Sequence, residues 1–295
     1  MSGKAYIVFG LPMPRLTPNK LVRPFLKWAG GKRQLLPELI RHMPDTYNKY
    51  YEPFIGGGAL LFALQPKKAV ISDSNQELIS CYTVIRDSLD ELVENLRHHR
   101  NEEDYFYRIR EWDRQDSFST KTPVQKAARI IFLNKTCYNG LFRVNAQGQF
   151  NAPFGRYTNP NILDEAVLKA VSSYLNTAKV DLLNQDFAKT VAKARKNDFI
   201  YFDPPYDPVS DTASFTGYDI NGFNKDEQKR LRDTFVKLSD KGCKVMLSNA
   251  YTNFIRDLYQ DYTCIRVKAT RAINSKASRR GKIDEILVKN YEGNG

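Results

Sequence analysis

Residues 198–206 carry the side chains whose types and order are best suited to chemistry. An apolar run ends in Asp203, and Pro204, Pro205 and Tyr206 follow it directly. If the run is a strand of an α/β sheet, Asp203 and the Pro204 carbonyl become fixed acceptors at the carboxyl edge, where such sheets bind ligands. Two adjacent acceptors match the two hydrogens of an exocyclic amino group. Holding both hydrogens turns the nitrogen lone pair outward, as nucleophilic attack by that nitrogen requires.

Tyr206 adds an aromatic surface beside this pair of acceptors. Stacking against the ring that bears the amino group is worth about 1–3 kcal/mol. The alternative interpretation is an ordinary turn in which the Asp203 carboxylate caps the end of a strand. We favour the chemical interpretation because a simple turn requires neither the two prolines nor the aromatic residue.

A second candidate site is the glycine cluster after Phe54, which includes Gly56 and Gly58. Glycines directly after a strand let the backbone approach a ligand closely. The next predicted strand ends at Asp73, about 17 residues beyond Gly56, where a carboxylate can accept hydrogen bonds from ribose hydroxyls. This spacing favours a nucleoside-type cofactor, although it is not the dinucleotide fingerprint. The alternative is a tight turn with no ligand.

A third candidate is the segment 25–32, in which Lys27, Trp28 and Lys32 surround two glycines. It is not a phosphate-binding P-loop, because Leu26 and Arg33 stand where that motif needs glycine and a hydroxyl residue. A tryptophan beside two lysines suits a nucleoside and a carboxylate. A packed tryptophan with surface lysines is the alternative.

The elements that must position these residues follow from the apolar pattern. Short apolar runs predict seven buried strands, at residues 49–54, 69–73, 180–183, 198–203, 243–248, 263–268 and 285–289. Helix-period stretches alternate with them. One is predicted to begin with Ser74 as its N-cap and Glu77 as the capping-box partner, and another to begin at Asn224 and stop at Gly242. This alternation predicts an open α/β sheet with helices on both faces.

Residues 77–176 interrupt the alternation and are mostly helical in pattern. They contain one predicted hairpin, whose limbs at 141–145 and 149–153 are joined by a turn with Gly148 at positive φ. Alternation would place Arg143 on one face of this hairpin and Phe142 on the other. We interpret the region as an inserted second domain with a basic finger.

Charge is concentrated in two parts of the chain. The 295 residues include 45 Lys and Arg against 33 Asp and Glu, a formal net charge of +12. Residues 117–163 hold six basic side chains and residues 266–282 hold seven, and neither segment has an acidic one. Such segments favour a polyanionic partner, either nucleic acid or anionic lipid. Solvated basic faces are the alternative.

Cysteine content and hydropathy exclude several classes of protein. The four cysteines are far apart and form no CxxC pair, which argues against a disulfide scaffold and a metal knuckle and favours a reduced, cytoplasmic setting. No apolar run reaches the roughly 18 residues that a membrane-spanning helix needs. We therefore expect no metal and no membrane partner.

The three candidate elements resemble those of S-adenosylmethionine-dependent DNA adenine-N6 methyltransferases in their order along the chain, with Phe54, Gly56 and Gly58 before the insert and the segment 203–206 after it. More narrowly, the chain resembles the Dam family, which includes GATC-modifying enzymes of restriction–modification systems. The resemblance runs from about residue 23 to 291 and includes the segments 27–32, 138–141 and 153–157. It implies a Rossmann-like methyltransferase sheet.

The resemblance also implies a division of the chain. Residues 23–76 and 177–295 would form the catalytic domain, and residues 77–176 a mainly helical target-recognition domain carrying the hairpin. Residues 1–22 would be a leader with no counterpart in the family.

Residue roles follow from the same resemblance. It implies that the methyl donor is bound by Trp28, Lys32, Phe54, Gly56, Gly58, Asp73, Asp186, Phe187 and Asp203. It implies that the flipped target adenine is held by Asp203, Pro204, Pro205 and Tyr206. DNA would be contacted by Lys27, Tyr138, Asn139, Leu141, Arg143, Pro153 and Tyr157, with Arg143 reading a guanine.

We therefore expect an enzyme that transfers a methyl group to adenine N6 in double-stranded DNA, with GATC as the favoured site. No cysteine follows a proline, which argues against cytosine-C5 chemistry. We expect a monomer, with an unlinked partner endonuclease if the role is restriction–modification rather than replication and repair. The alternatives are an RNA or protein amide-nitrogen methyltransferase of the same fold and a DNA-binding module without turnover.

Overall fold

The computed structural model describes residues 18–28, 30, 32, 34–208, 223–270 and 282–292. Most of the predicted leader lies outside these residues, as do Ala29 and Gly31 of the third candidate segment. The centre of the second basic segment, residues 271–281, also lies outside them.

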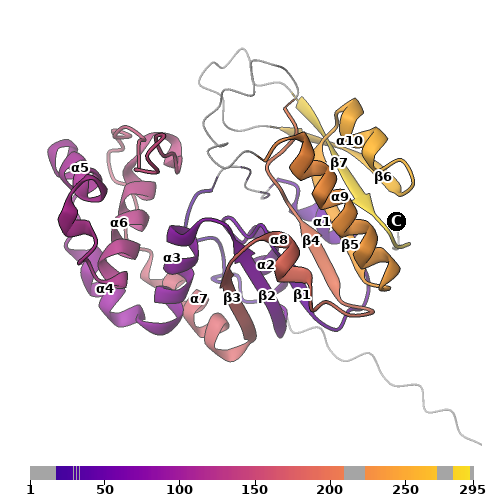
Figure 1. The fold of residues 1–295 in the computed structure, drawn as a ribbon. Coiled ribbons are helices and arrows are strands. Elements are labelled where there is room, and N and C mark those ends of the chain that lie inside the picture. The colour runs from indigo at the N-terminus through magenta and orange to yellow at the C-terminus, as the bar shows by residue number, and fades with distance from the viewer. Residues whose placement is uncertain are drawn as a thin grey trace, which may run out of the picture.

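The strands form one seven-stranded sheet in the order β3-β2-β1-β4-β5-β7-β6 (Figure 1). Their bounds are β1 (Tyr50–Glu52), β2 (Lys68–Asp73), β3 (Lys179–Asn184), β4 (Phe199–Phe202), β5 (Lys244–Ala250), β6 (Thr263–Thr270) and β7 (Lys282–Lys289). The pairs from β3 to β5 are parallel, and β7 runs antiparallel to both of its neighbours. The predicted open α/β sheet is confirmed, and each strand overlaps its predicted run.

Helices cover both faces of this sheet, because parallel strands must be buried on two sides. One face packs on α1 (Leu36–Arg41), α2 (Ala59–Leu64), α3 (Gln76–Asp87) and α7 (Glu165–Thr177). The other packs on α8 (Phe187–Val191), α9 (Lys225–Asp240) and α10 (Asn253–Leu258). Adjacent residues of β1 face the two layers in turn, because Tyr50 is buried in one apolar cluster and Tyr51 in the other.

The remaining helices lie together to one side of the sheet (Figure 1). They are α4 (Leu89–Arg97), α5 (Glu103–Arg110), α6 (Pro123–Thr136) and the short 3-10 helices η1 (Glu111–Arg114), η2 (Asp116–Phe118) and η3 (Tyr138–Gly140). A single buried cluster runs from Ile71 on the sheet to Ile131 on α6. The two parts share a core, and the boundaries of the inserted domain stay a prediction.

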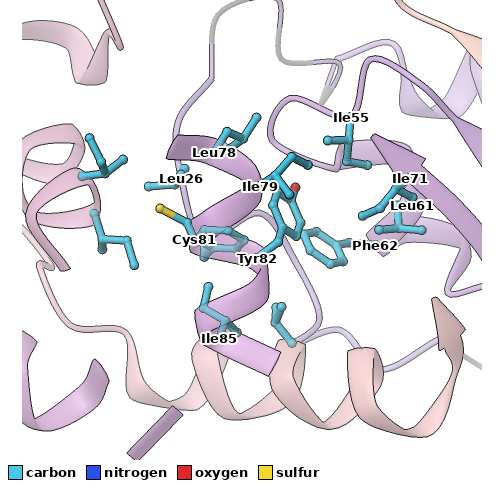
Figure 2. Close-up of a cluster of buried hydrophobic side chains, with 14 of the residues drawn as sticks. Leu26, Ile55, Leu61, Phe62, Ile71, Leu78, Ile79, Cys81, Tyr82 and Ile85 are labelled. Atoms are coloured by element: carbon cyan, nitrogen blue, oxygen red, sulfur yellow. The ribbon is translucent and has the colours of Figure 1, made fainter. Parts of the chain in front are cut away.

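Helix α3 joins the two parts of this core (Figure 2). Tyr82 points toward Phe62 and the sheet residue Ile71, whereas Cys81 points the other way. Its sulfur lies 3.9 Å from the carbonyl oxygen of Ala127 on α6. The helix is therefore buried on opposite sides, against the sheet and against the inserted helices.

Two local predictions need correction. Helix α3 is capped by Asn75, whose side chain accepts the Leu78 N–H at 2.9 Å, and not by Ser74. Asparagine caps at least as well as serine, so the helix begins one residue later than predicted. The hairpin has its turn with Gly148 at φ 77°, and its limbs are paired, but only around a single bridge between Val144 and Phe150 and not as two full strands. The N-cap at Asn224 is confirmed, because Asn224 accepts two N–H groups of α9.

Gly58 and Gly148 have similar φ angles but different surroundings, so substitutions at the two positions distinguish the cost of backbone strain from the cost of steric crowding. Gly58 has φ 70°, and a Cβ there would lie 2.6 Å from the Tyr82 hydroxyl, whereas Gly148 has φ 77° and open space around it. We expect Gly148→Ala to cost about 1–2 kcal/mol, the usual cost of a left-handed non-glycine residue. Gly58→Ala should cost at least about 1 kcal/mol more, because crowding adds to strain. Urea unfolding of both variants measures the difference, and equal losses would contradict the account.

Candidate active site

The three candidate elements meet at the carboxyl edge of the sheet. The glycine cluster follows β1, Asp73 ends β2, and Asp203 follows β4. The crossover from β1 to β2 contains α2 on one face, and the crossover from β3 to β4 contains α8 on the other. The strand order therefore reverses between the adjacent strands β1 and β4, which is where sheets of this type bind ligands.

Lys32, Asp203 and Tyr206 form the central contact of this edge. The Lys32 ammonium lies 2.9 Å from Asp203 Oδ1 and 4.3 Å from the centre of the Tyr206 ring. Only 7% of the Lys32 side chain and 18% of the Asp203 side chain are exposed. The Tyr206 hydroxyl donates to Glu285 at 2.6 Å, which fixes the ring. Residues predicted from two separate motifs are therefore in direct contact.

The two oxygens of Asp203 differ in their partners. Oδ1 accepts hydrogen bonds from Lys32 and from the Ser248 hydroxyl, each at 2.9 Å. Oδ2 has no hydrogen-bond donor among the described residues. Burial raises the pKa of Asp203, and the nearby Lys32 and Ser248 oppose that increase by stabilising the ionised form. One carboxylate oxygen is thus available as an acceptor.

The backbone after Asp203 is fixed by polar side chains that the sequence analysis did not single out. Gln228 on α9 donates to the Pro205 carbonyl at 2.9 Å, and Asn249 accepts the Asp207 N–H at 3.0 Å. Gln228 and Asn249 are also bonded to each other. Within the part of the chain that the structure describes, the Pro204 carbonyl has no donor. It is therefore a second available acceptor, in the residue directly after Asp203.

The glycine cluster is bonded to the end of β2. The Gly56 N–H donates to Asp73 Oδ2 at 3.1 Å, and the Asn75 N–H donates to Oδ1 at 2.9 Å. Trp28 lies against this loop, because a Cβ on Gly56 would be 2.9 Å from its ring. The structure therefore brings Trp28, Gly56 and Asp73 together, and Gly56 is needed for the close approach.

Asp186 and Phe187 lie at the start of α8, beside Phe54. The centres of the Phe54 and Phe187 rings are 5.4 Å apart. Arg230 on α9 donates to both oxygens of Asp186, at 3.1 and 2.7 Å, and its guanidinium lies 4.1 Å from the centre of the Phe187 ring. The hydrogen bond from Arg230 lowers the pKa of Asp186. No local signal in the sequence linked Arg230 to this pair.

On the side nearer the inserted helices, Lys27 lies next to Tyr157, with the ammonium 5.4 Å from the ring centre. Asn134, which is buried on α6, bonds to both the N–H and the carbonyl of Lys27 and to the carbonyl of Gly140. Tyr138 is 46% exposed, and Asn139 next to it has φ 58°. The Asn134 side chain thus joins the N-terminal segment to the predicted DNA-contacting turn.

The hairpin presents its two faces as the alternation predicted. Arg143 is exposed, whereas Phe142 is buried and stacks on Trp28 with ring centres 4.9 Å apart. The Pro153 carbonyl accepts the Tyr138 N–H at 2.8 Å, which closes the base of the hairpin next to Leu141. All seven predicted DNA-contacting residues therefore lie in or beside one continuous region.

Arg129 does not belong to the predicted basic surface. Its side chain is fully buried and pairs with Asp113 at 2.6 Å. Sequence counting assigned it to an acid-free segment, but Asp113 lies just before that segment and neutralises it in the fold. Five basic residues remain in residues 117–163.

Two kinds of feature are absent from the described residues. None of the helices in this part of the chain combines the length and apolar character needed to cross a membrane. No cluster of three or more His, Cys, Asp or Glu side chains with the arrangement of a metal site occurs among them either.

Comparison with known proteins gives matches over almost the whole chain. Residues 28–273 match the family described as D12 class N6 adenine-specific DNA methyltransferase. The Type II methyltransferase M1.LlaDCHI of Lactococcus lactis subsp. cremoris is 47% identical over 282 residues, covering 95% of this chain and 99% of that protein.

Two further relatives have similar coverage. The Type II methyltransferase M.MjaIII of Methanocaldococcus jannaschii is 43% identical over 290 residues, covering 92% of this chain and 99% of that protein. The DNA adenine methylase of Serratia marcescens is 36% identical over 272 residues, covering 90% of this chain and 97% of that protein. The matches include the segments that build the site.

A buried carboxyl group beneath the site gives a pH-dependent prediction. Glu52 is 3% exposed and accepts a hydrogen bond from the Tyr50 hydroxyl at 2.8 Å. Burial raises its pKa to about 8, and the charge of Asp203 adds to the increase. The folded protein therefore keeps a proton on Glu52 that the unfolded chain releases near pH 4.5. Retaining this proton lowers the free energy of unfolding, because the unfolded chain gains free energy by releasing it. The loss grows as the pH rises from about 4.5 to about 8, so Glu52 lowers stability over that range.

We expect Glu52→Gln to remove this cost. The free energy of unfolding of the variant, relative to the parent, should increase as the pH is raised from 5.5 to 8. Urea unfolding at several pH values measures it, with Glu91→Gln, at an exposed glutamate, as the matched control. Parallel stability curves for Glu52→Gln and the parent would contradict the prediction.

Proposed function

The chain belongs to the family of D12 class N6 adenine-specific DNA methyltransferases, and from that premise we propose that it methylates adenine N6 at GATC in duplex DNA. Membership makes it an adenine-specific DNA methyltransferase, a class that uses S-adenosylmethionine. The single observation that carries the proposed assignment of the site is the contact between Lys32 and Asp203. It leaves Asp203 Oδ2 available as an acceptor, in the residue directly before Pro204.

The residues of the edge fit S-adenosylmethionine by their chemistry. Each oxygen of Asp73 accepts one backbone hydrogen bond and keeps acceptor capacity for a ribose hydroxyl. Asp186 keeps one acceptor position on Oδ2 for the donor's adenine amino group, with Phe187 and Phe54 as the adjoining apolar surface. When bound, S-adenosylmethionine supplies an electrophilic methyl group on a positively charged sulfur.

Charge balance at the edge supports the same donor. Two of its carboxylates are paired with cations, Asp203 with Lys32 and Asp186 with Arg230. A third, Asp73, accepts hydrogen bonds from backbone N–H groups, such as that of Gly56. The remaining negative charge complements a sulfonium. Trp28 and the glycines Gly56 and Gly58 complete the proposed donor site on the side of β1.

For the acceptor, we propose that the target adenine leaves the base stack, because N6 is hidden inside a duplex. Asp203 Oδ2 and the Pro204 carbonyl accept its two amino hydrogens, and the Lys32 ammonium keeps the carboxylate ionised. Pro205 and Tyr206 shape the pocket around the ring. Lys32 covers one face of Tyr206, so stacking on the adenine would use the other face. The methyl group would leave the donor's sulfur as a neutral thioether, and the methylated nitrogen would then release one of its two protons to solvent.

The exposed residues around the hairpin are proposed to contact DNA. Arg143 would read the guanine, with Leu141, Pro153 and Tyr157 beside it and Lys27 on the neighbouring segment. Tyr138 and Asn139 would support the space left by the flipped base. We propose GATC because the resemblance to the Dam family covers these positions, and a relative named DNA adenine methylase supports it.

The wider context is part of the proposal. Residues 77–176 would act as the target-recognition domain, and the protein would act as a monomer in the cytoplasm, where the DNA lies. The relatives named Type II methyltransferases support a role in restriction–modification beside an unlinked endonuclease.

Removal of the Asp203 carboxylate tests the proposed acceptor site. We expect Asp203→Ala to lower the rate of methyl transfer to a GATC duplex on the order of 10²–10⁴-fold, because the reacting amino group loses a positioned acceptor. Initial rates with labelled S-adenosylmethionine measure the effect, and a gel-shift assay checks that DNA binding persists. The exposed Asp181→Ala serves as the matched control. Near-normal turnover by Asp203→Ala would refute the assignment.

Removal of the Arg143 guanidinium tests the proposed reader. A bidentate contact to guanine is worth about 1–3 kcal/mol of discrimination. We therefore expect Arg143→Ala to reduce the preference for GATC over AATT by roughly 5- to 150-fold, which is the same range expressed as a ratio of kcat/KM values. AATT replaces the first and last base pairs of GATC together, so an unchanged preference would show that other residues read both of them.

A further inference from the structure

A mostly buried carboxylate outside the proposed site, that of Asp113, is hydrogen-bonded to the hairpin. Asp113 on η1 is bonded to Arg129 Nη2 and to Arg114 Nη1, each at 2.6 Å. Its Oδ2 also accepts the N–H of Phe150 on the returning limb of the hairpin at 2.7 Å. Three donors on separate segments therefore converge on one carboxylate.

Arg129 gives this carboxylate a rigid base. The side chain is fully buried, and it donates to the carbonyls of Ile109 at 2.9 Å and Arg110 at 2.7 Å at the end of α5. The Glu77 carboxylate of α3 lies 3.8 Å away. A buried charge held on several sides in this way does not change position easily. The position of Asp113 is therefore set by α3, α5 and α6 together.

Phe150 is held at both of its backbone polar groups. Asp113 accepts its N–H, and Arg114 Nη2 donates to its carbonyl at 2.8 Å. Its ring is fully buried and lies against Phe142, with ring centres 5.8 Å apart. We call Asp113, Arg114 and Arg129 the hairpin clamp.

Asn151, the residue after Phe150, is hydrogen-bonded to Arg143, the residue proposed to read guanine. The Asn151 carbonyl accepts two hydrogen bonds from the Arg143 guanidinium, at 3.2 and 2.6 Å. The Asn151 N–H donates to the Arg143 carbonyl at 2.7 Å. Arg143 is thus connected to the clamp through one peptide bond, between Phe150 and Asn151.

We propose that Asp113 is a specificity-determining positioning residue that acts through Arg143. The hairpin has a single bridge of its own, and isolated two-stranded hairpins are marginally stable in water. The hydrogen bond at its base, from Tyr138 to Pro153, does not reach the tip, so the clamp is what fixes the returning limb at Phe150. A guanidinium must be held within about 0.5 Å to make a bidentate contact, so a displaced returning limb weakens the reading of guanine. The inference rests on the proposed role of Arg143.

Asp113→Asn removes the negative charge of the clamp with little change in the shape of the side chain. We expect the ratio of kcat/KM for GATC over AATT to fall at least about tenfold, while the affinity for S-adenosylmethionine stays within about twofold of the parent. Asp116→Asn, the same substitution at an exposed aspartate three residues along, should leave the ratio unchanged. A purely structural role would lower the rates on both duplexes equally and leave the ratio as it was.

A double-mutant cycle shows whether Asp113 acts through Arg143. In the Arg143→Ala background, Asp113→Asn should have no further effect on the GATC preference. A full additional loss there would overturn the proposed route through Arg143. If Asp113→Asn is poorly folded, the double variant D113L/R129M removes both charges together, which avoids leaving a buried cation unpaired. It should show the same loss of preference, and parental preference in that variant would overturn the inference.

The outcomes separate this inference from the function on which it rests. Absence of any GATC preference in the parent enzyme would refute the proposed recognition site. A parental preference that depends on Arg143 but survives in both clamp variants would overturn the role of Asp113 alone.

Discussion

The ion pair between Lys32 and Asp203 is the interaction on which the site depends. A nearly buried lysine is costly unless its charge is paired, so the N-terminal segment that carries it is held at the end of β4. The same ammonium lies over Tyr206, and the same carboxylate oxygen accepts the Ser248 hydroxyl of β5. Because these donors occupy Oδ1, the acceptor face that remains is Oδ2 with the Pro204 carbonyl. The pair thus determines which atoms are left for chemistry.

Trp28 connects this site to the inserted helices. One part of its ring lies against Gly56 at the proposed donor loop, and it stacks on Phe142 of the hairpin. The residues next to the two stacked rings are exposed: Lys27 precedes Trp28, and Arg143 follows Phe142. In each pair, one residue is part of the stack and the other is exposed to solvent. They lie over one shared core, which connects the proposed reading surface to the proposed donor loop.

Much of the fold followed from sequence because strand runs and short motifs are local signals. The run ending in Asp203 predicted both β4 and its carboxyl-edge position, and Asn224 predicted a helix start. The contributions of Ser248, Arg230 and Asp113 were not predictable, because each depends on a partner distant in sequence. Arg129 was misassigned for the same reason. It lies in an acid-free segment and was counted as part of a basic surface, but in the fold it is buried and paired with Asp113. The Asn75 cap shows that adjacent capping residues compete and sequence alone does not rank them.

Mapping of N6-methyladenine at every adenine of a natural DNA shows whether the enzyme transfers methyl groups at one sequence. Unmethylated plasmid DNA is incubated with the purified enzyme and S-adenosylmethionine, and the modified positions are mapped by sequencing that detects N6-methyladenine on each strand. The account predicts N6-methyladenine at the adenine of GATC on both strands and background levels at all other adenines. Modification spread over other sequences would contradict the proposed reading by the hairpin, and an absence of N6-methyladenine would contradict the proposed chemistry of the site.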